Sequence, residues 1–164
     1  MFGFKKIFAI SVLSFFVHGC STVNLSSNYL ECSAPSALSS QACSNLVLAN
    51  SAFERGDFGT AEKNFRISAD ILGKDAPGTS SHIEALLGLA ASYDTMARFD
   101  LADPVYAQLS QLAPDEPEYL NNYGYSLLLR GDVKNAREYF ERARVQSPEN
   151  QVIMNNGQMA MNGQ

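Results

Sequence analysis

The sequence predicts an all-α fold, an array of three helix-turn-helix pairs followed by a single C-terminal helix. Apolar residues three and four positions apart recur through long stretches, and short Gly, Asp and Pro segments interrupt them, as is typical of helical hairpins. A second observation is an internal repeat of 34 residues. It divides the chain into pairs at about 42–75, 83–116 and 117–150, with the last helix at 151–164.

The 34-residue repeat is carried by apolar, aromatic, small and proline residues that recur at equivalent positions. The pairs are Leu86 and Leu120, Leu89 and Tyr123, Ala90 and Gly124, Tyr93 and Leu127, Ala102 and Ala136, Tyr106 and Phe140, Leu109 and Ala143, and Pro114 and Pro148. Small residues such as Gly124 and Ala136 let two helices approach closely, and the aromatic Phe140 fills the space that is left. This pattern resembles the tetratricopeptide repeat, which implies a superhelix of stacked helix pairs.

A third, more degenerate copy lies upstream, with Ala49, Ala52, Ala61 and Phe65 at equivalent positions. The turn 55–57 repeats the Arg-Gly-Asp sequence of 130–132. The terminal proline is missing from this copy. We expect Gly73 to end its second helix instead, and an insertion at 74–80 separates it from the next repeat.

Several residues predict where helices begin. Ser81 and Glu84 have the spacing of a capping box, and Pro117 suits the first turn of a helix. Pro104 lies inside an expected helix, where we predict that it removes one hydrogen bond and delays the helix start. The last helix, in which 155–156 repeats the Asn pair of 121–122, is interpreted as a cap that covers the final pair rather than as a binding element.

The N-terminus predicts a lipoprotein. Lys5 and Lys6 precede a mostly apolar run, 7–17, that is too short to span a bilayer. The run leads to Gly19 and Cys20, which resemble a lipobox, so residues 1–19 are expected to be a signal peptide and Cys20 to be acylated. An ordinary secretory signal is the alternative. Ser21 after the cysteine implies the outer membrane, and residues 20–41, rich in Ser, Ala and Asn, are expected to form a flexible tether.

The charge of the chain limits the classes of partner that it can bind, and its cysteines indicate a possible disulfide. The whole chain has a net charge of −5, and loss of residues 1–19 leaves ten basic against 17 acidic side chains. Such a surface repels nucleic acid and anionic lipid, so we expect neither to bind directly. Outside the cytoplasm Cys32 and Cys43 could pair in a disulfide; the alternative is a Cys43 packed as a small apolar residue and a free Cys32.

No catalytic or metal-binding constellation is evident in the sequence. His82 would be the one histidine left after processing, and it lies at an expected helix start. No His, Cys or carboxylate cluster has metal-ligand spacing, and no Gly-rich phosphate loop follows a strand. We therefore expect no enzyme, no cofactor and no small-molecule substrate.

The function expected of the array is to bind another protein. The first helix of each pair lines the concave side of such an array, so its residues that do not pack are candidates for a partner-binding groove. These candidates are Asn50, Phe53, Glu84, Leu87, Ala91, Asp94, Asn121, Asn122, Tyr125 and Leu128. Tyr125 and Asn121 are favoured, because a tyrosine offers a rigid face and an amide can pair with a peptide backbone. The alternative is that such residues only complete turns or cover neighbours.

Three segments, 86–94, 98–102 and 120–126, resemble the TadD family of lipoproteins, which serve tight-adherence (Flp) pilus assembly. The resemblance implies an outer-membrane accessory that helps a secretin or another pilus component to assemble, and it brings no catalytic residues. The Asn-Asn-Tyr-Gly sequence at 121–124 is also similar to pilotins of type IV pili. An adaptor of cell-wall hydrolases is a further alternative.

Overall fold

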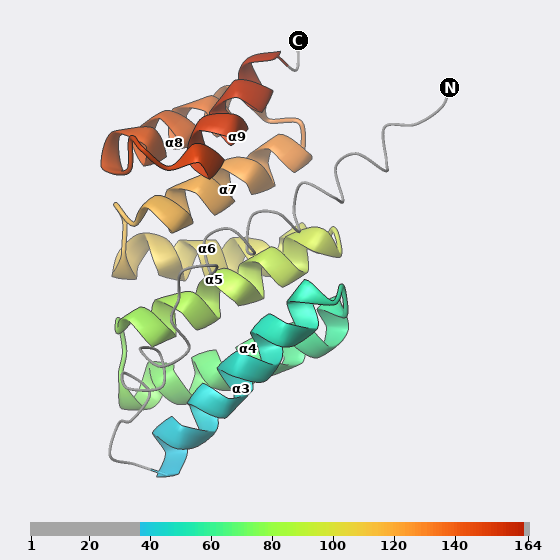
Figure 1. Cartoon of the computed structure of the whole chain (residues 1–164), viewed down its shortest axis with the longest axis vertical. Coiled ribbons are helices and arrows are strands. Elements are labelled where there is room, and N and C mark those ends of the chain that lie inside the picture. The colour runs from blue at the N-terminus through green and yellow to red at the C-terminus, as the bar shows by residue number, and fades with distance from the viewer. Residues whose placement is uncertain (1–36, 163–164) are drawn as a thin grey trace.

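The structure, a computed structural model, describes residues 37–162, and that range contains seven helices. They are α3 (Ala37–Glu54), α4 (Phe58–Asp75), α5 (Ser80–Thr95), α6 (Phe99–Leu112), α7 (Pro117–Leu129), α8 (Val133–Gln146) and α9 (Gln151–Asn162). Figure 1 shows them stacked along the long axis, from the pair α3–α4 at one end to α8 and α9 at the other. The prediction of three helix pairs and a C-terminal helix is confirmed. We call α3, α5, α7 and α9 the A helices, and α4, α6 and α8 the B helices.

Close approach of the helices in each pair depends on small residues set against an aromatic ring. A Cβ placed on Gly124 would lie 3.0 Å from the Phe140 ring and 3.3 Å from the carbonyl oxygen of Ala136, and Phe140 is buried. In the first repeat the ring of Phe65 packs against Gly88 of the next A helix. The predicted packing of Phe140 with Gly124 and Ala136 is confirmed, and the contact of Phe65 with Gly88 adds a similar arrangement between repeats. Both contacts fix how near the helices lie.

Tyrosines fill the core between the second and third repeats. The ring of Tyr123 lies 4.9 Å from that of Tyr106 and 4.8 Å from that of Tyr139, centroid to centroid, and Tyr119 stacks on Tyr123 at 6.2 Å. Edge and tilted contacts of this kind contribute beyond the area they bury. The two repeats therefore share one apolar core across α6, α7 and α8.

The turns inside the three repeats have the same backbone geometry. Gly56, Ala97 and Gly131 each have a positive φ, at 78°, 56° and 83°. The following backbone N–H then donates to a carbonyl five residues back, as from Arg98 to Tyr93 at 2.8 Å. This closes the A helix with a left-handed residue, a conformation that suits glycine. Only the second repeat places a residue with a Cβ there.

Ala97→Gly is therefore expected to raise the free energy of unfolding by about 0.5–1 kcal/mol, because relief of left-handed strain exceeds the added entropy of the unfolded chain. Urea unfolding followed by circular dichroism measures it. Gly131→Ala, at the equivalent turn, is the matched control and should lower stability by a similar amount. Equal stability of Ala97→Gly and the parent protein would contradict the shared turn geometry.

Helix ends differ from the sequence prediction at four places. The N-cap of α5 is Thr79, whose Oγ1 accepts from the backbone N–H of His82 at 3.4 Å, so the capping box predicted at Ser81 and Glu84 is wrong. Helix α4 continues to Asp75, past Gly73. Helix α6 begins at Phe99 in the same register as the other B helices, so Pro104 does not delay it. Residues 37–41 of the predicted tether belong to α3.

Pro104 is tolerated because it lies on the exposed side of α6, where only the carbonyl of Asp100 loses its helical donor and water can replace it. Thr79 is the N-cap because, with the insertion 74–80 before it, α5 begins at Ser80, earlier in the sequence than the repeat spacing predicts. Within the range 37–162 no helix is both long and apolar enough to cross a bilayer. The predicted signal peptide, Cys20 and Cys32 lie outside the described residues.

Candidate interaction face

The residues predicted to line a groove fall into rows, because positions one repeat apart occupy equivalent places on successive A helices. The spacing is 34 residues between the second and third repeats and 41 between the first and second, since the insertion adds seven. The rows are Glu84 and Glu118; Leu87 and Asn121; Asn50, Ala91 and Tyr125; and Phe53, Asp94 and Leu128. We call these residues, with the adjacent Asn122, the A-helix face. Glu118 was not among the sequence candidates and is added by this register.

Burial divides the A-helix face into two groups. Four residues are buried, namely Phe53, Leu87, Asp94 and Asn121. Glu118 is exposed, and the half-buried members are Asn50, Glu84, Ala91, Asn122, Tyr125 and Leu128. A partner can touch the second group directly, whereas the first group holds the helices together. That any of them binds a partner stays a prediction.

Hydrogen bonds between side chains connect each A helix to the next. Asn50 Nδ2 donates to Glu84 Oε1 at 2.9 Å and joins α3 to α5. Ser126 Oγ donates to Asp94 Oδ1 at 2.7 Å and joins α5 to α7, and Asn156 Nδ2 donates to Asn121 Oδ1 at 2.8 Å and joins α7 to α9. We call these three bonds the polar rungs. Because two of the three are buried, they are protected from competition with water and fix the spacing of the A helices.

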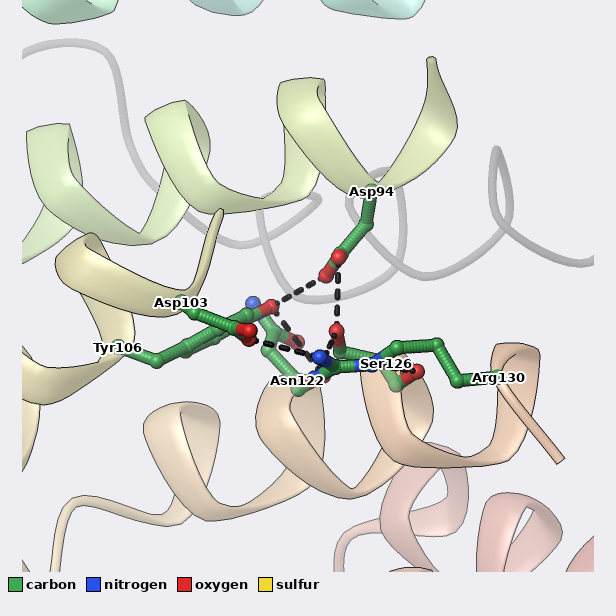
Figure 2. A network of polar contacts seen from close by, with 6 residues as sticks. All are labelled: Asp94, Asp103, Tyr106, Asn122, Ser126 and Arg130. Atoms are coloured by element: carbon green, nitrogen blue, oxygen red, sulfur yellow. Dashed lines mark hydrogen bonds and ion pairs between the residues drawn. The ribbon is translucent and has the colours of Figure 1, made fainter. Parts of the chain in front are cut away.

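The middle rung is part of a larger network around Asp94, shown in Figure 2. The hydroxyl of Tyr106 lies 2.6 Å from Asp94 Oδ2 and 3.2 Å from the backbone carbonyl oxygen of Asn122. A hydroxyl has one proton to donate, and it donates to the ionised carboxylate in preference to the more distant carbonyl. Asp94 therefore accepts from both Tyr106 and Ser126, and it connects α5 to α6 and α7 at once.

Arg130 extends this network to the surface. Its Nη2 donates to Ser126 Oγ at 3.2 Å, its Nε to the Ser126 carbonyl at 3.2 Å, and its Nη1 forms an ion pair with Asp103 Oδ1 at 2.8 Å. Its guanidinium also lies 5.3 Å from the centre of the Phe99 ring. Sequence reasoning missed Tyr106, Ser126 and Arg130 as polar partners of Asp94, because their separations of 12, 32 and 36 residues follow no repeat period.

Burial raises the pKa of Asp94 to about 6, against the opposing effects of the hydrogen bonds from Tyr106 and Ser126 and of the charge on Arg130. A carboxyl whose pKa is higher in the folded state binds its proton more tightly there than in the unfolded chain. Its contribution to stability is therefore complete below about pH 4 and is lost as the pH rises to about 6. The two ends of this window differ by roughly 2–3 kcal/mol.

Asp94→Asn is accordingly expected to raise the free energy of unfolding by about 1–3 kcal/mol at pH 7.5 and to leave it nearly unchanged at pH 4. The amide imitates the protonated acid: it can donate to the Tyr106 oxygen while that hydroxyl turns to the Asn122 carbonyl. Urea unfolding at both values of pH measures the difference between variant and parent. A gain that is the same at both would contradict the titration of Asp94 in this window.

His82, on which an enzymatic alternative would depend, is buried at 1% exposure. Its Nδ1 accepts from the backbone N–H of Gly78 at 3.1 Å and so fixes the insertion, while burial lowers its pKa. Its Nε2 faces Gly73. Among the residues 37–162 no group of three His, Cys, Asp or Glu side chains could hold a metal ion. Cys43 forms a disulfide, and its pairing with Cys32 stays a prediction.

Positive charge is separated from the A-helix face along the whole array. The four A helices contain no Lys or Arg, whereas they carry Glu54, Glu84, Asp94 and Glu118. All ten basic residues of the described range lie on α4 and α8 or in the turns that follow the A helices. The A-helix face is therefore neutral to acidic, and the cations of the described range lie on two B helices and in the turns.

Comparison with known proteins agrees with this architecture. The tetratricopeptide repeat family model matches residues 87–150, which run from α5 to the end of the third repeat. The C-terminal tetratricopeptide domain of an FK506-binding protein from Plasmodium falciparum is similar, with a TM-score of 0.61 and 16% identity over 76% of this chain and 88% of that one. The first tetratricopeptide domain of Spaghetti (RPAP3), bound to the HSP90 peptide SRMEEVD, has a TM-score of 0.63 and 15% identity over 76% and 93%.

No curated protein sequence matches the chain. The fold is a tetratricopeptide repeat superhelix. At 15 to 16% identity the two solved structures define the fold alone.

Proposed function

We propose that this chain is a lipid-anchored scaffold of the bacterial outer membrane that helps a pilus or secretion apparatus of the Flp type to assemble. Its partner is a protein, a secretin or another pilus component, and the A-helix face holds a segment of it. The observation that carries the proposal is that the polar rungs fix the four A helices while the half-buried amide side chains of Asn50 and Asn122 lie at their surface.

The chemistry of the half-buried residues suits a peptide backbone. The Nδ2 group of Asn122 makes no hydrogen bond with any residue in the range 37–162, although its Oδ1 accepts from Asn121 at 3.3 Å. Asn50 is the converse case: its Nδ2 donates to Glu84, and its Oδ1 can accept a hydrogen bond. One such donor and one such acceptor can pair with a peptide bond, while Tyr125 and Leu128 offer apolar contact. The RPAP3 domain, of similar fold, binds a short peptide.

The anchor and the pathway rest on the sequence. The lipobox at Cys20 and the following Ser21 support an outer-membrane location, and the similarity of 86–94 and 120–126 to TadD lipoproteins supports Flp pilus assembly. A pilotin of type IV pili or an adaptor of cell-wall hydrolases is the alternative partner class. Cys20→Ser tests the anchor: the variant should leave the membrane fraction or stay unprocessed, and undiminished membrane attachment of a processed chain would rule out acylation at Cys20.

The partner is tested by formaldehyde crosslinking in cells, purification of the chain and mass spectrometry of what is attached. Secretin or pilus subunits are expected, and Asn122→Ala and Tyr125→Ala should reduce their yield. Asn64→Ala, which removes an amide from the B helix α4, is the matched control and should not. Recovery of peptidoglycan enzymes alone would replace the pilus proposal with the adaptor, and equal yields from all variants would remove the A-helix face from the binding site.

A further inference from the structure

We propose that the A-helix face selects cationic chain segments and rejects acidic ones, with Glu84 and Glu118 receiving Lys or Arg side chains of the partner. The inference rests on the proposed function, since it names the chemistry of the segment that the same face would hold.

The A-helix face has no cation that an acidic ligand could use. None of the four A helices, α3, α5, α7 and α9, contains a Lys or an Arg. Of the three basic residues in the turns, Arg130 is paired with Asp103 and held against Ser126, and Arg55 donates to Ser51. The third, Arg98, lies over the Tyr93 ring, 5.9 Å from its centre. On the B helices, Arg66 pairs with Glu62 and Arg144 with Glu141. A carboxylate that entered the A-helix face would lose water and gain no opposite charge.

Glu84 and Glu118, in contrast, have room for a positive partner. Glu84 is half-buried and uses Oε1 to accept from Asn50, and no Lys or Arg pairs with it in the described range. Glu118 stands one repeat further along in the equivalent place and is exposed. Glu116 adds a third carboxyl beside it, and hydrogen bonding to Glu118 raises the pKa of Glu116 to about 7. The negative charge on Glu118 also repels that on Glu116, and a cation that binds beside the two carboxyls relieves this repulsion.

The peptide bound to the RPAP3 domain differs in charge from the segment proposed here. The HSP90 peptide in that structure, SRMEEVD, contains two Glu and one Asp beside a single Arg. A peptide of that composition would bring its carboxylates to a face that already carries Glu84 and Glu118 and has no cation. Similar folds therefore do not imply similar ligands here, because the fold sets the shape of the face and the side chains on it set the charge of the segment.

The test uses the full chain and a displayed library of random heptapeptides, the length of SRMEEVD. Retained peptides should be enriched in Lys and Arg and depleted of Asp and Glu, and their binding should weaken as salt rises. Glu84→Gln should reduce affinity for them about tenfold, while it keeps an oxygen for Asn50. Glu138→Gln, on the exposed side of α8, is the matched control and should change nothing.

Retention of Asp and Glu at or above their input frequency would overturn the inference, and so would an unchanged affinity in Glu84→Gln or the absence of any enriched peptide. The proposed function has a separate criterion. If enriched peptides bind equally well to Asn122→Ala and Leu128→Ala, they bind elsewhere and the A-helix face is not the site. If those variants lose binding but the peptides are acidic, the face stands as the site and only its charge preference is wrong.

Discussion

Gly88→Ala is expected to lower the free energy of unfolding by about 3 kcal/mol, although alanine is the better helix former. A Cβ at this position would lie 2.3 Å from Cε1 and Cζ of Phe65 and 2.6 Å from Cδ1. Phe65 is fully buried, and its ring lies edge-on to Phe53 at 6.5 Å, so it has nowhere to move without separating α4 from α5. Urea unfolding of the full chain, followed at 222 nm, measures the loss.

Gly59→Ala is the matched control, because a Cβ there meets nothing within 4 Å on the helix α4. It should raise stability by about 0.5–1 kcal/mol. Phe65→Leu placed in the Gly88→Ala background should recover part of the loss, since a smaller side chain leaves space for the new methyl group. If Gly88→Ala is as stable as the parent, α4 and α5 do not approach as closely as described.

Phe140→Ala is expected to cost about 3–5 kcal/mol, the range for removing a buried aromatic side chain that leaves a cavity. Phe140 is 2% exposed and packs on both Gly124 and Gly157, so it supports α7 and α9 together. Loss of the ring should therefore loosen α9 first. Hydrogen exchange of backbone amides measures this order of opening, and urea unfolding measures the total.

Val145→Ala on the same helix is the control, with a side chain that is 65% exposed. Its effect should stay within about 0.5 kcal/mol. Equal losses in Phe140→Ala and Val145→Ala would mean that Phe140 does not fill the space between the helices. Amides of α9 that stay as protected in Phe140→Ala as in the parent would contradict its contact with Gly157.

Much of the fold follows from a few sequence positions. The spacing of Ala102 to Ala136 and of Tyr106 to Phe140 is enough to predict the helix pairs, because only side chains that pack between helices must keep their size in each copy. Gly56 and Gly131 similarly predict the turns. Ala97 breaks that pattern, and the structure nevertheless forms the same turn there, so packing of the repeat overrides the local preference.

The candidate site was less predictable. Counting along a helix places Asp94 and Asn121 on the concave side but does not tell which neighbouring side chains cover them. Asp94 is buried because Tyr106 from the B helix and Ser126 from the next A helix both reach its carboxylate, and Asn121 because Asn156 does. The absence of Lys and Arg from the A helices was visible in the sequence, but its meaning required knowledge of which helices form one face.

Whether the A-helix face holds a segment of a partner protein can be measured with a photo-crosslinking amino acid placed at single positions of the full chain in its native cells. Positions Tyr125 and Leu128 sample the A-helix face, and Glu138 and Val145 sample the exposed side of the B helix α8. We expect a discrete protein adduct from Tyr125 and Leu128 and none from α8. Adducts that form only from α8, or equally from both sides, would contradict it.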